Sequence, residues 1–170
     1  MRTMLFKILH IKSLLLVLLM CSYNVMAATK IETVKDLREL KKQAEPDNLP
    51  VLLMFTAEDC EYCEALSKHY LVPMLESGEY NSIILFRQLY IDDYDYLRNA
   101  KGELISGDSF ALKYDVEVTP TLLFVNSEMQ EVAKRIVGLS GFDYFDETLK
   151  THINEAKYFM AKKTSVKTKY

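Results

Sequence analysis

Hydrophobic and polar positions follow a helical period in some stretches of the chain and form short apolar runs in others. After Thr33, apolar residues recur at helical spacing at Val34, Leu37 and Leu40. We therefore expect a helix capped by Thr33. A loop with two prolines ends this helix, and residues 51–55 then form a continuous apolar run. Such a run predicts a central strand that is covered on both faces.

A second helix is predicted to begin at or near Cys60. Its buried stripe repeats every three or four residues and consists of Cys63, Leu66, Tyr70 and Met74. Pro73 should kink or end this helix, because proline lacks the N–H group that an inner helical turn needs. Residues 82–91 then predict a second strand.

The second half of the chain opens with a long polar segment, residues 92–108, that contains Tyr94 and Tyr96. The elements expected after it are a short helix over 109–114, a hairpin of strands 121–125 and 131–137, and a last helix from Ser140 to about Phe159. Ser140 together with Asp143 resembles a capping box. The order α-β-α-β-α-β-β-α predicts an α/β fold, with a central mixed sheet flanked by helices on both faces.

The composition of the 170 residues, 49% hydrophobic and 26% charged, excludes collagen-like, low-complexity and disordered classes. We expect one domain over residues 28–160 and a basic, disordered tail over 161–170, which holds four lysines and no acid. Residues 1–27 hold three basic residues and no acid, so the remainder carries a net charge of −6. A chain with this negative net charge is not expected to bind nucleic acid, because that binding needs lysine and arginine to neutralise phosphates.

Residues 1–27 have the pattern of a secretory signal peptide. Three basic residues precede the apolar run 14–21, and Val25 and Ala27 stand where a cleavage site requires them. We predict cleavage after Ala27, export to the periplasm and no stable membrane insertion afterwards. The alternative is an uncleaved membrane anchor over residues 13–29, which is only just long enough to span a bilayer. Lipidation of Cys21 is not expected, because a lipobox has a small residue before its cysteine and Met20 is not small.

Export would place the two remaining cysteines, Cys60 and Cys63, in an oxidising compartment. Two cysteines three positions apart on a helix face one side and can close a disulfide. Unpaired N–H groups and the helix dipole favour the thiolate of a cysteine at a helix N-terminus. We therefore expect Cys60 to be the catalytic nucleophile and Cys63, one turn further, to be the resolving thiol. A Cys-x-x-Cys motif that follows a buried strand and opens a helix strongly indicates redox chemistry.

This cysteine pair has two other interpretations. A zinc site needs further ligands, but no second cysteine pair exists beyond residue 27, His69 falls on another face of the helix, and His152 is remote in sequence. A purely structural disulfide would be a weak staple, because closing so short a loop removes little entropy from the unfolded chain. We favour redox activity over both alternatives and expect no metal.

At these residues the chain resembles the thioredoxin superfamily and, within it, the exported SoxW-like proteins. The resemblance runs from about Val51 to Asn154. It rests on residues 53–63, which end in the two cysteines, on residues 118–124, and on Val137-Gly138 before the last helix. It implies a thioredoxin-like fold and dithiol–disulfide exchange on protein substrates, without a bound cofactor.

The resemblance also implies a substrate-binding region. Pro120 matches the cis-proline that the family places beside its active cysteines, where Thr119 would turn its backbone towards an incoming peptide. The alternative is that Pro120 is an ordinary proline heading a strand. Tyr62, between the two cysteines, is the third residue expected to contact substrate. The implied partners are protein thiols or disulfides and an electron donor that the sequence does not identify, with the protein acting as a monomer.

The sequence departs from thioredoxins at several positions. Met54 stands where they have a buried aspartate, and Asp59 replaces the usual tryptophan before the first cysteine. Glu58 could substitute as a proton acceptor, although a solvated loop acid is the plainer interpretation. The long 92–108 segment is typical of the SoxW-like proteins, and we expect its tyrosines to pack the loop rather than cover the site.

Four acids surround the first cysteine in sequence: Glu58, Asp59, Glu61 and Glu64. Negative neighbours disfavour a thiolate, so they oppose the helix dipole at Cys60. Strong oxidases depend on a very stable thiolate, and we therefore predict a reductant or a mild exchanger. The alternative from another class is a non-enzymatic adaptor of the same fold, in which Cys60 and Cys63 stay permanently bridged. An isomerase is not expected, because residues 33–50 are too few for the dimerisation domain such enzymes carry.

Overall fold

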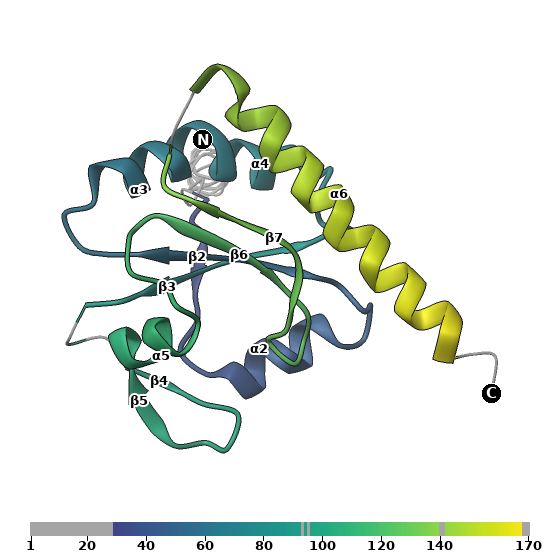
Figure 1. Cartoon of the computed structure of the whole chain (residues 1–170), viewed down its shortest axis with the longest axis horizontal. Helices are drawn as coiled ribbons and strands as arrows, with labels where there is room; N and C mark the ends of the chain where they lie inside the picture. Colours follow the sequence, from purple (N-terminus) through teal and green to yellow (C-terminus); the bar gives the residue numbers. More distant parts are fainter. Residues whose placement is uncertain (1–28, 93, 95, 140–141, 168–170) are drawn as a thin grey trace, which may run out of the picture.

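A computed structural model describes residues 29–92, 94, 96–139 and 142–167 of the chain (Figure 1). Its centre is a mixed sheet of five strands in the order β1-β3-β2-β6-β7. Their bounds are β1 (Glu32–Thr33), β2 (Val51–Thr56), β3 (Leu85–Tyr90), β6 (Thr121–Val125) and β7 (Glu131–Val137). The first three strands run parallel, whereas β6 is antiparallel to β2 and β7 is antiparallel to β6. The predicted signal peptide lies outside the described residues, and so does Ser140 of the predicted capping box.

Helices cover both faces of this sheet (Figure 1). One face carries α2 (Leu37–Ala44) and α5 (Gly107–Lys113). The other carries α3 (Glu61–Leu66), the π-helical turn η1 (Ser67–Leu71), α4 (Val72–Ser77) and the long α6 (Phe142–Lys167). The side chains of β2 alternate between two buried clusters, so that Leu52 and Met54 meet the second set of helices and Leu53 and Phe55 meet the first. The expected α/β fold with helices on both faces is therefore confirmed.

The C-terminal helix α6 packs along β7 and β6 through a stripe that includes the fully buried Leu149, Ile153 and Ala156. It continues to Lys167, so the prediction that it ends near Phe159 is wrong, and the expected tail begins as helix. Alanine and lysine at positions 161–163 favour helix, which explains the extension. Within the described part of the chain, no helix is long and apolar enough to cross a membrane.

The first helix begins later than predicted. Asp36, rather than Thr33, caps α2, and its carboxylate accepts a hydrogen bond from the backbone N–H of Arg38 at 2.9 Å. Thr33 belongs instead to the short edge strand β1, where its hydroxyl accepts a hydrogen bond from the Gln88 side chain at 3.1 Å. A strand of two residues is too short to show a hydrophobic period, so the sequence did not predict β1.

Pro73 does not end its helical segment. The π-turn η1 precedes it, and the N–H of Val72 donates to the carbonyl of Ser67, five residues back. A proline ring clashes with the carbonyl four residues earlier in a regular helix, and the wider π-turn shifts the hydrogen-bond register just before the ring. The helical segment therefore continues through α4 to Ser77, where Gly78 adopts a left-handed conformation at φ 71°.

The polar segment 92–108 holds a two-stranded antiparallel sheet of β4 (Tyr96–Arg98) and β5 (Leu104–Ser106). Leu97 of β4 is buried in the core beneath α2 and α5. The prediction that the tyrosines pack this segment is wrong, because Tyr94 is 92% exposed and Tyr96 is 51% exposed. In a strand, alternate residues face opposite sides, and here the inward position is taken by leucine.

The short helix α5 starts at Gly107, two residues before its predicted beginning. A Cβ atom on Gly107 would lie 2.0 Å from the carbonyl oxygen of Tyr90, at the end of β3. Only glycine allows α5 to approach β3 this closely.

Candidate active site

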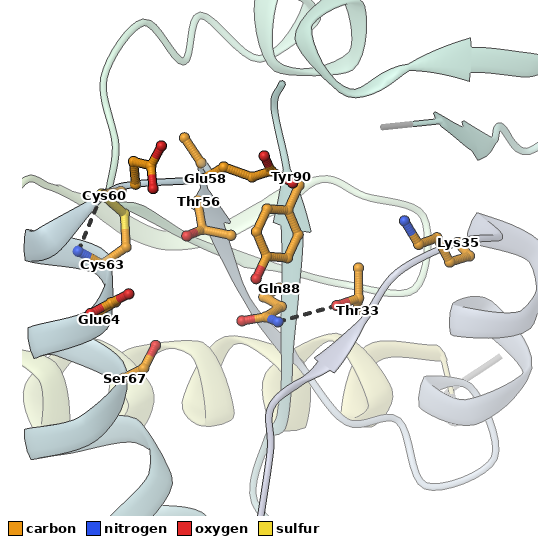
Figure 2. A pocket seen from close by; sticks show the side chains of 12 residues that line it. Thr33, Lys35, Thr56, Glu58, Cys60, Cys63, Glu64, Ser67, Gln88 and Tyr90 are labelled. Atoms are coloured by element: carbon orange, nitrogen blue, oxygen red, sulfur yellow. Dashed lines mark hydrogen bonds between the residues drawn. A yellow bond between two sulfur atoms is a disulfide. The ribbon is translucent and has the colours of Figure 1, made fainter. Parts of the chain in front are cut away.

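The two cysteines of the motif lie at the start of α3, after the loop that follows β2, and they are joined by a disulfide (Figure 2). Cys60 is the N-cap of α3, with an extended backbone, and its Sγ accepts a hydrogen bond from the N–H of Cys63 at 3.2 Å. The Cα atoms of the pair are 5.2 Å apart. Cys60 therefore lies among the unpaired N–H groups of the helix start, as predicted.

The loop between β2 and α3 is anchored to the end of β3. The backbone N–H of Glu58 donates a hydrogen bond to the Asp92 carboxylate at 2.8 Å. Asp59 has a left-handed backbone, with φ at 55°, which aspartate tolerates better than most residues. Asp92 was missed as a site residue, although an acid directly after an apolar strand run is the signal that could have identified it.

The segment before β6 approaches the disulfide from the other side. The Thr119–Pro120 peptide bond is cis, as expected. The Thr119 hydroxyl donates a hydrogen bond to Sγ of Cys60 at 3.4 Å, and Pro120 is buried. This geometry brings together residues far apart in the sequence, while the substrate-presenting role of Thr119 and Pro120 stays a prediction.

The two sulfur-bearing side chains differ in accessibility. Cys63 is only 3% exposed, whereas Cys60 is half-buried. Tyr62, between them, lies on the solvent side of α3 and is 61% exposed. An incoming group therefore reaches Cys60 more readily than Cys63, and Tyr62 is open to contact it.

A polar groove of about 520 Å³ lies beside the disulfide (Figure 2). It is lined by Thr33, Lys35, Thr56, Ala57, Glu58, Asp59, Cys60, Cys63, Glu64, Ser67, Gln88 and Tyr90. The sequence motif and its flanking acids placed residues 56–64 of this set near the site, and the other lining residues were not predicted. Strand pairing adds Thr33 and Gln88, since β3 runs beside β2 and β1 runs beside β3, and the two side chains are joined by a hydrogen bond.

Met54 occupies the buried position on β2 that faces α3. It is 1% exposed, its register partner on β3 is Gln88, and its sulfur accepts a long contact from the Ser67 hydroxyl at 3.8 Å. Neither Met54 nor Gln88 is ionisable, so this pair supplies no proton acceptor to Cys63. Glu58 lines the groove as an exposed residue, which fits the interpretation of a solvated loop acid.

Negative charge outweighs positive charge around the cysteines. Glu58, Asp59 and Glu64 line the groove together with Cys60, and Glu61 is exposed in the first turn of α3. Lys35, which the sequence pattern did not bring to the site, is the cation in the groove lining. Among the described residues, no three histidine, cysteine, aspartate or glutamate side chains converge as a metal site.

Comparison with known proteins identifies the domain. The thioredoxin-like domain family matches residues 37–153 of the chain. The chain belongs to this family. No curated protein sequence matches the chain at a significant level.

Solved thioredoxins share the fold. Poplar thioredoxin h is 18% identical with a TM-score of 0.51, and the match covers 72% of this chain and 96% of that one. Thioredoxin f from spinach chloroplast is 18% identical with a TM-score of 0.51, covering 78% and 98%. Mitochondrial thioredoxin 3 of Saccharomyces cerevisiae, in its oxidised form, is 17% identical with a TM-score of 0.50, covering 74% and 94%. At these identities the likeness establishes the fold, and the thioredoxin-like domain with its Cys60–Cys63 disulfide supports a thiol–disulfide redox function.

Proposed function

We propose that this thioredoxin-like protein is an exported thiol–disulfide oxidoreductase that acts on protein substrates as a monomer without a bound cofactor. The observation that carries the proposal is the position of Cys60, which caps α3 and accepts a hydrogen bond from Thr119 beside the cis Pro120. The half-buried sulfur of Cys60 lies at a helix start, and the Thr119–Pro120 segment next to it could pair with a substrate peptide. This arrangement suits exchange with a cysteine of another protein.

The exchange proceeds in two balanced steps. The Cys60 thiolate attacks one sulfur of a substrate disulfide, the other substrate sulfur leaves as a thiolate, and a mixed disulfide forms. Cys63 then loses its proton and attacks Sγ of Cys60, which releases the second substrate sulfur and forms the Cys60–Cys63 disulfide. Two electrons have passed to the substrate, and a donor dithiol restores the two protein thiols by the reverse sequence.

The direction we propose is reduction or mild exchange. Three carboxylates share the groove with Cys60, and carboxylates near a sulfur oppose the formation of a thiolate there. Lys35 offsets part of this charge. Because the acids are exposed, water and salt weaken their effect, so they moderate the helix dipole without cancelling it.

The export and SoxW-like parts of the proposal rest on the N-terminal pattern of residues 1–27 and on the long segment 92–108. Periplasmic location is tested by expressing the full chain in a Gram-negative bacterium and sequencing the N-terminus of the periplasmic product. A product that begins at Ala28 supports export and cleavage, whereas retention of the full chain in the membrane supports the anchor alternative.

Turnover distinguishes an enzyme from an adaptor with a permanent bridge. The experiment is the reduction of insulin disulfides by a small dithiol, with the native chain in catalytic amounts. We expect acceleration by the native chain and none by the Cys60→Ser variant. An uncatalysed rate with the native chain, together with a Cys60–Cys63 bridge that the dithiol leaves intact, would establish the adaptor instead.

A further inference from the structure

Charge is strongly segregated along the chain beyond residue 27. Residues 28–156 carry 13 lysines and arginines and 24 acids, whereas residues 157–170 carry five lysines and no acid. The last acid, Glu155, contacts Nδ1 of His152 at 2.9 Å. The end of α6 therefore forms a positive pole on an otherwise negative protein.

The same end of α6 leaves the body of the domain. Ala156 and Met160 are its last buried side chains among those described, and Asn48 donates a hydrogen bond to the carbonyl of Met160 at 3.2 Å. The side chains of residues 161–163 are all exposed. In Figure 1 this part of α6 runs away from the sheet, at the opposite end of the molecule from the start of α3.

Two large aromatic side chains face solvent beside these lysines. Tyr158 is 71% exposed and Phe159 is 47% exposed. Lys162 follows Tyr158 by four residues, and Lys163 follows Phe159 by four, so each lysine neighbours an aromatic ring on the helix surface. The exposed end of α6 thus combines apolar rings and cations within two turns.

We propose that the described end of α6, residues 157–163, docks the protein onto the surface of an anionic phospholipid bilayer. Lysine clusters on a helix are attracted to acidic lipid headgroups, and aromatic rings insert at the headgroup level. The rings favour a bilayer over a nucleic acid, and the acidic body would be repelled by any long polyanion that it had to lie along.

Docking through this pole also orients the domain. The start of α3, which Cys60 caps, lies at the opposite end of the molecule from this pole, so the acids around Cys60 are held away from the lipid headgroups. The cysteines would therefore face away from the bilayer and stay open to proteins in solution. This orientation follows from charge alone and does not depend on the redox proposal.

Vesicle co-sedimentation tests the proposal. The probe is the chain from Ala28, which contains the whole described fold, with vesicles of phosphatidylcholine alone or with about one third phosphatidylglycerol. We expect binding only to the anionic vesicles and weaker binding as salt is raised. Each lysine near an anionic surface contributes about fivefold to the binding constant, so Lys157→Gln/Lys162→Gln/Lys163→Gln should bind about 100-fold more weakly.

Two further variants separate surface docking from general charge. Tyr158→Ser/Phe159→Ser should weaken binding while retaining its salt dependence. Lys101→Gln/Lys113→Gln removes two lysines elsewhere, one from the turn between β4 and β5 and one from the end of α5, and should bind like the native chain. Circular dichroism checks that each variant is folded.

The proposal is overturned by any of three results. The first is that the native chain fails to sediment with anionic vesicles, and the second is that the two lysine variants lose binding equally. The third is that a single-stranded oligonucleotide binds the same end of α6 more tightly than the vesicles do.

Discussion

The hydroxyl of Thr119 donates a hydrogen bond to Sγ of Cys60 across 3.4 Å, and it joins two residues that are 59 positions apart. We expect the same hydroxyl to donate to the Cys60 sulfur after the disulfide is reduced. A donor that faces a sulfur stabilises its thiolate more than its thiol, so Thr119 acts with the N–H groups of α3 and against the nearby acids.

Thr119→Val removes this donor while keeping the shape of the side chain. We expect the pKa of the Cys60 thiol to rise, because the thiolate loses a hydrogen-bond donor. The ultraviolet absorbance of the thiolate during a pH titration of the reduced protein measures this pKa. Thr119→Ser retains the hydroxyl and should behave like the native chain, whereas equal pKa values for the native and valine proteins would show that the hydrogen bond has no such effect.

The unequal burial of the two cysteines predicts unequal trapping of partners. Cys63→Ser leaves the accessible Cys60 free to attack but removes the resolving thiol, so stable mixed disulfides should accumulate. Cys60→Ser leaves only the buried Cys63 and should trap little. Non-reducing electrophoresis after incubation with a disulfide-bonded protein measures both, and equal trapping would refute the assigned roles.

The cap of α2 predicts a pH-dependent contribution to stability. The Arg38 side chain donates hydrogen bonds to the Asp36 carboxylate and lowers its pKa from 3.8 to about 2. A lowered pKa in the folded state means that the ionised carboxylate stabilises the fold above about pH 4, and that this contribution is lost as pH falls towards 2. Asp36→Asn should therefore be less stable than the native chain at pH 7, and the difference should be mostly lost by about pH 2.

Urea unfolding at a series of pH values measures this difference. A deficit of Asp36→Asn that stayed constant from pH 7 to pH 2 would contradict a role for the charge and leave only the geometry of the cap.

Gly107 should be intolerant of any side chain. In Gly107→Ala the new Cβ would meet the Tyr90 carbonyl oxygen at 2.0 Å, and backbone at the end of β3 cannot move aside cheaply. We expect a loss of about 3 kcal/mol of unfolding free energy, the upper end of what overpacking of a core usually costs.

Gly138→Ala is the matched control for this substitution. Gly138 has φ at 74°, but a Cβ there meets nothing within 4 Å, so only the left-handed backbone penalty of about 1 kcal/mol applies. Similar losses in the two variants, measured by chemical unfolding, would contradict the close approach of α5 to β3.

The parts of the fold that the sequence predicted are those with a strong local signal. The apolar run of β2 and the cysteine spacing after it placed Cys60 at a helix start, and the structure has Cys60 as the N-cap of α3. The hairpin of β6 and β7 was also predicted, because a turn with Asn126 separates the apolar run of β6 from a second stretch rich in valine and isoleucine.

Other parts depend on tertiary contacts that leave no local signal. The two-residue strand β1 exists only because it pairs with β3, and through that pairing Thr33 and Gln88 reach the groove beside Cys63. The β4–β5 hairpin is similar, since its three-residue strands are fixed by burial of Leu97 rather than by their tyrosines. Pairing between distant segments decides such elements, and composition alone does not report it.

The central claim is that Cys60 and Cys63 form a reversible redox pair of a reducing or mild kind. Equilibration of the protein with mixtures of reduced and oxidised glutathione, followed by thiol alkylation, measures its reduction potential directly. We predict full reversibility and a potential between about −270 and −200 mV, the range of thioredoxins and glutaredoxins. A potential near about −120 mV, as in strong periplasmic oxidants, or a bridge that glutathione never opens would contradict the account.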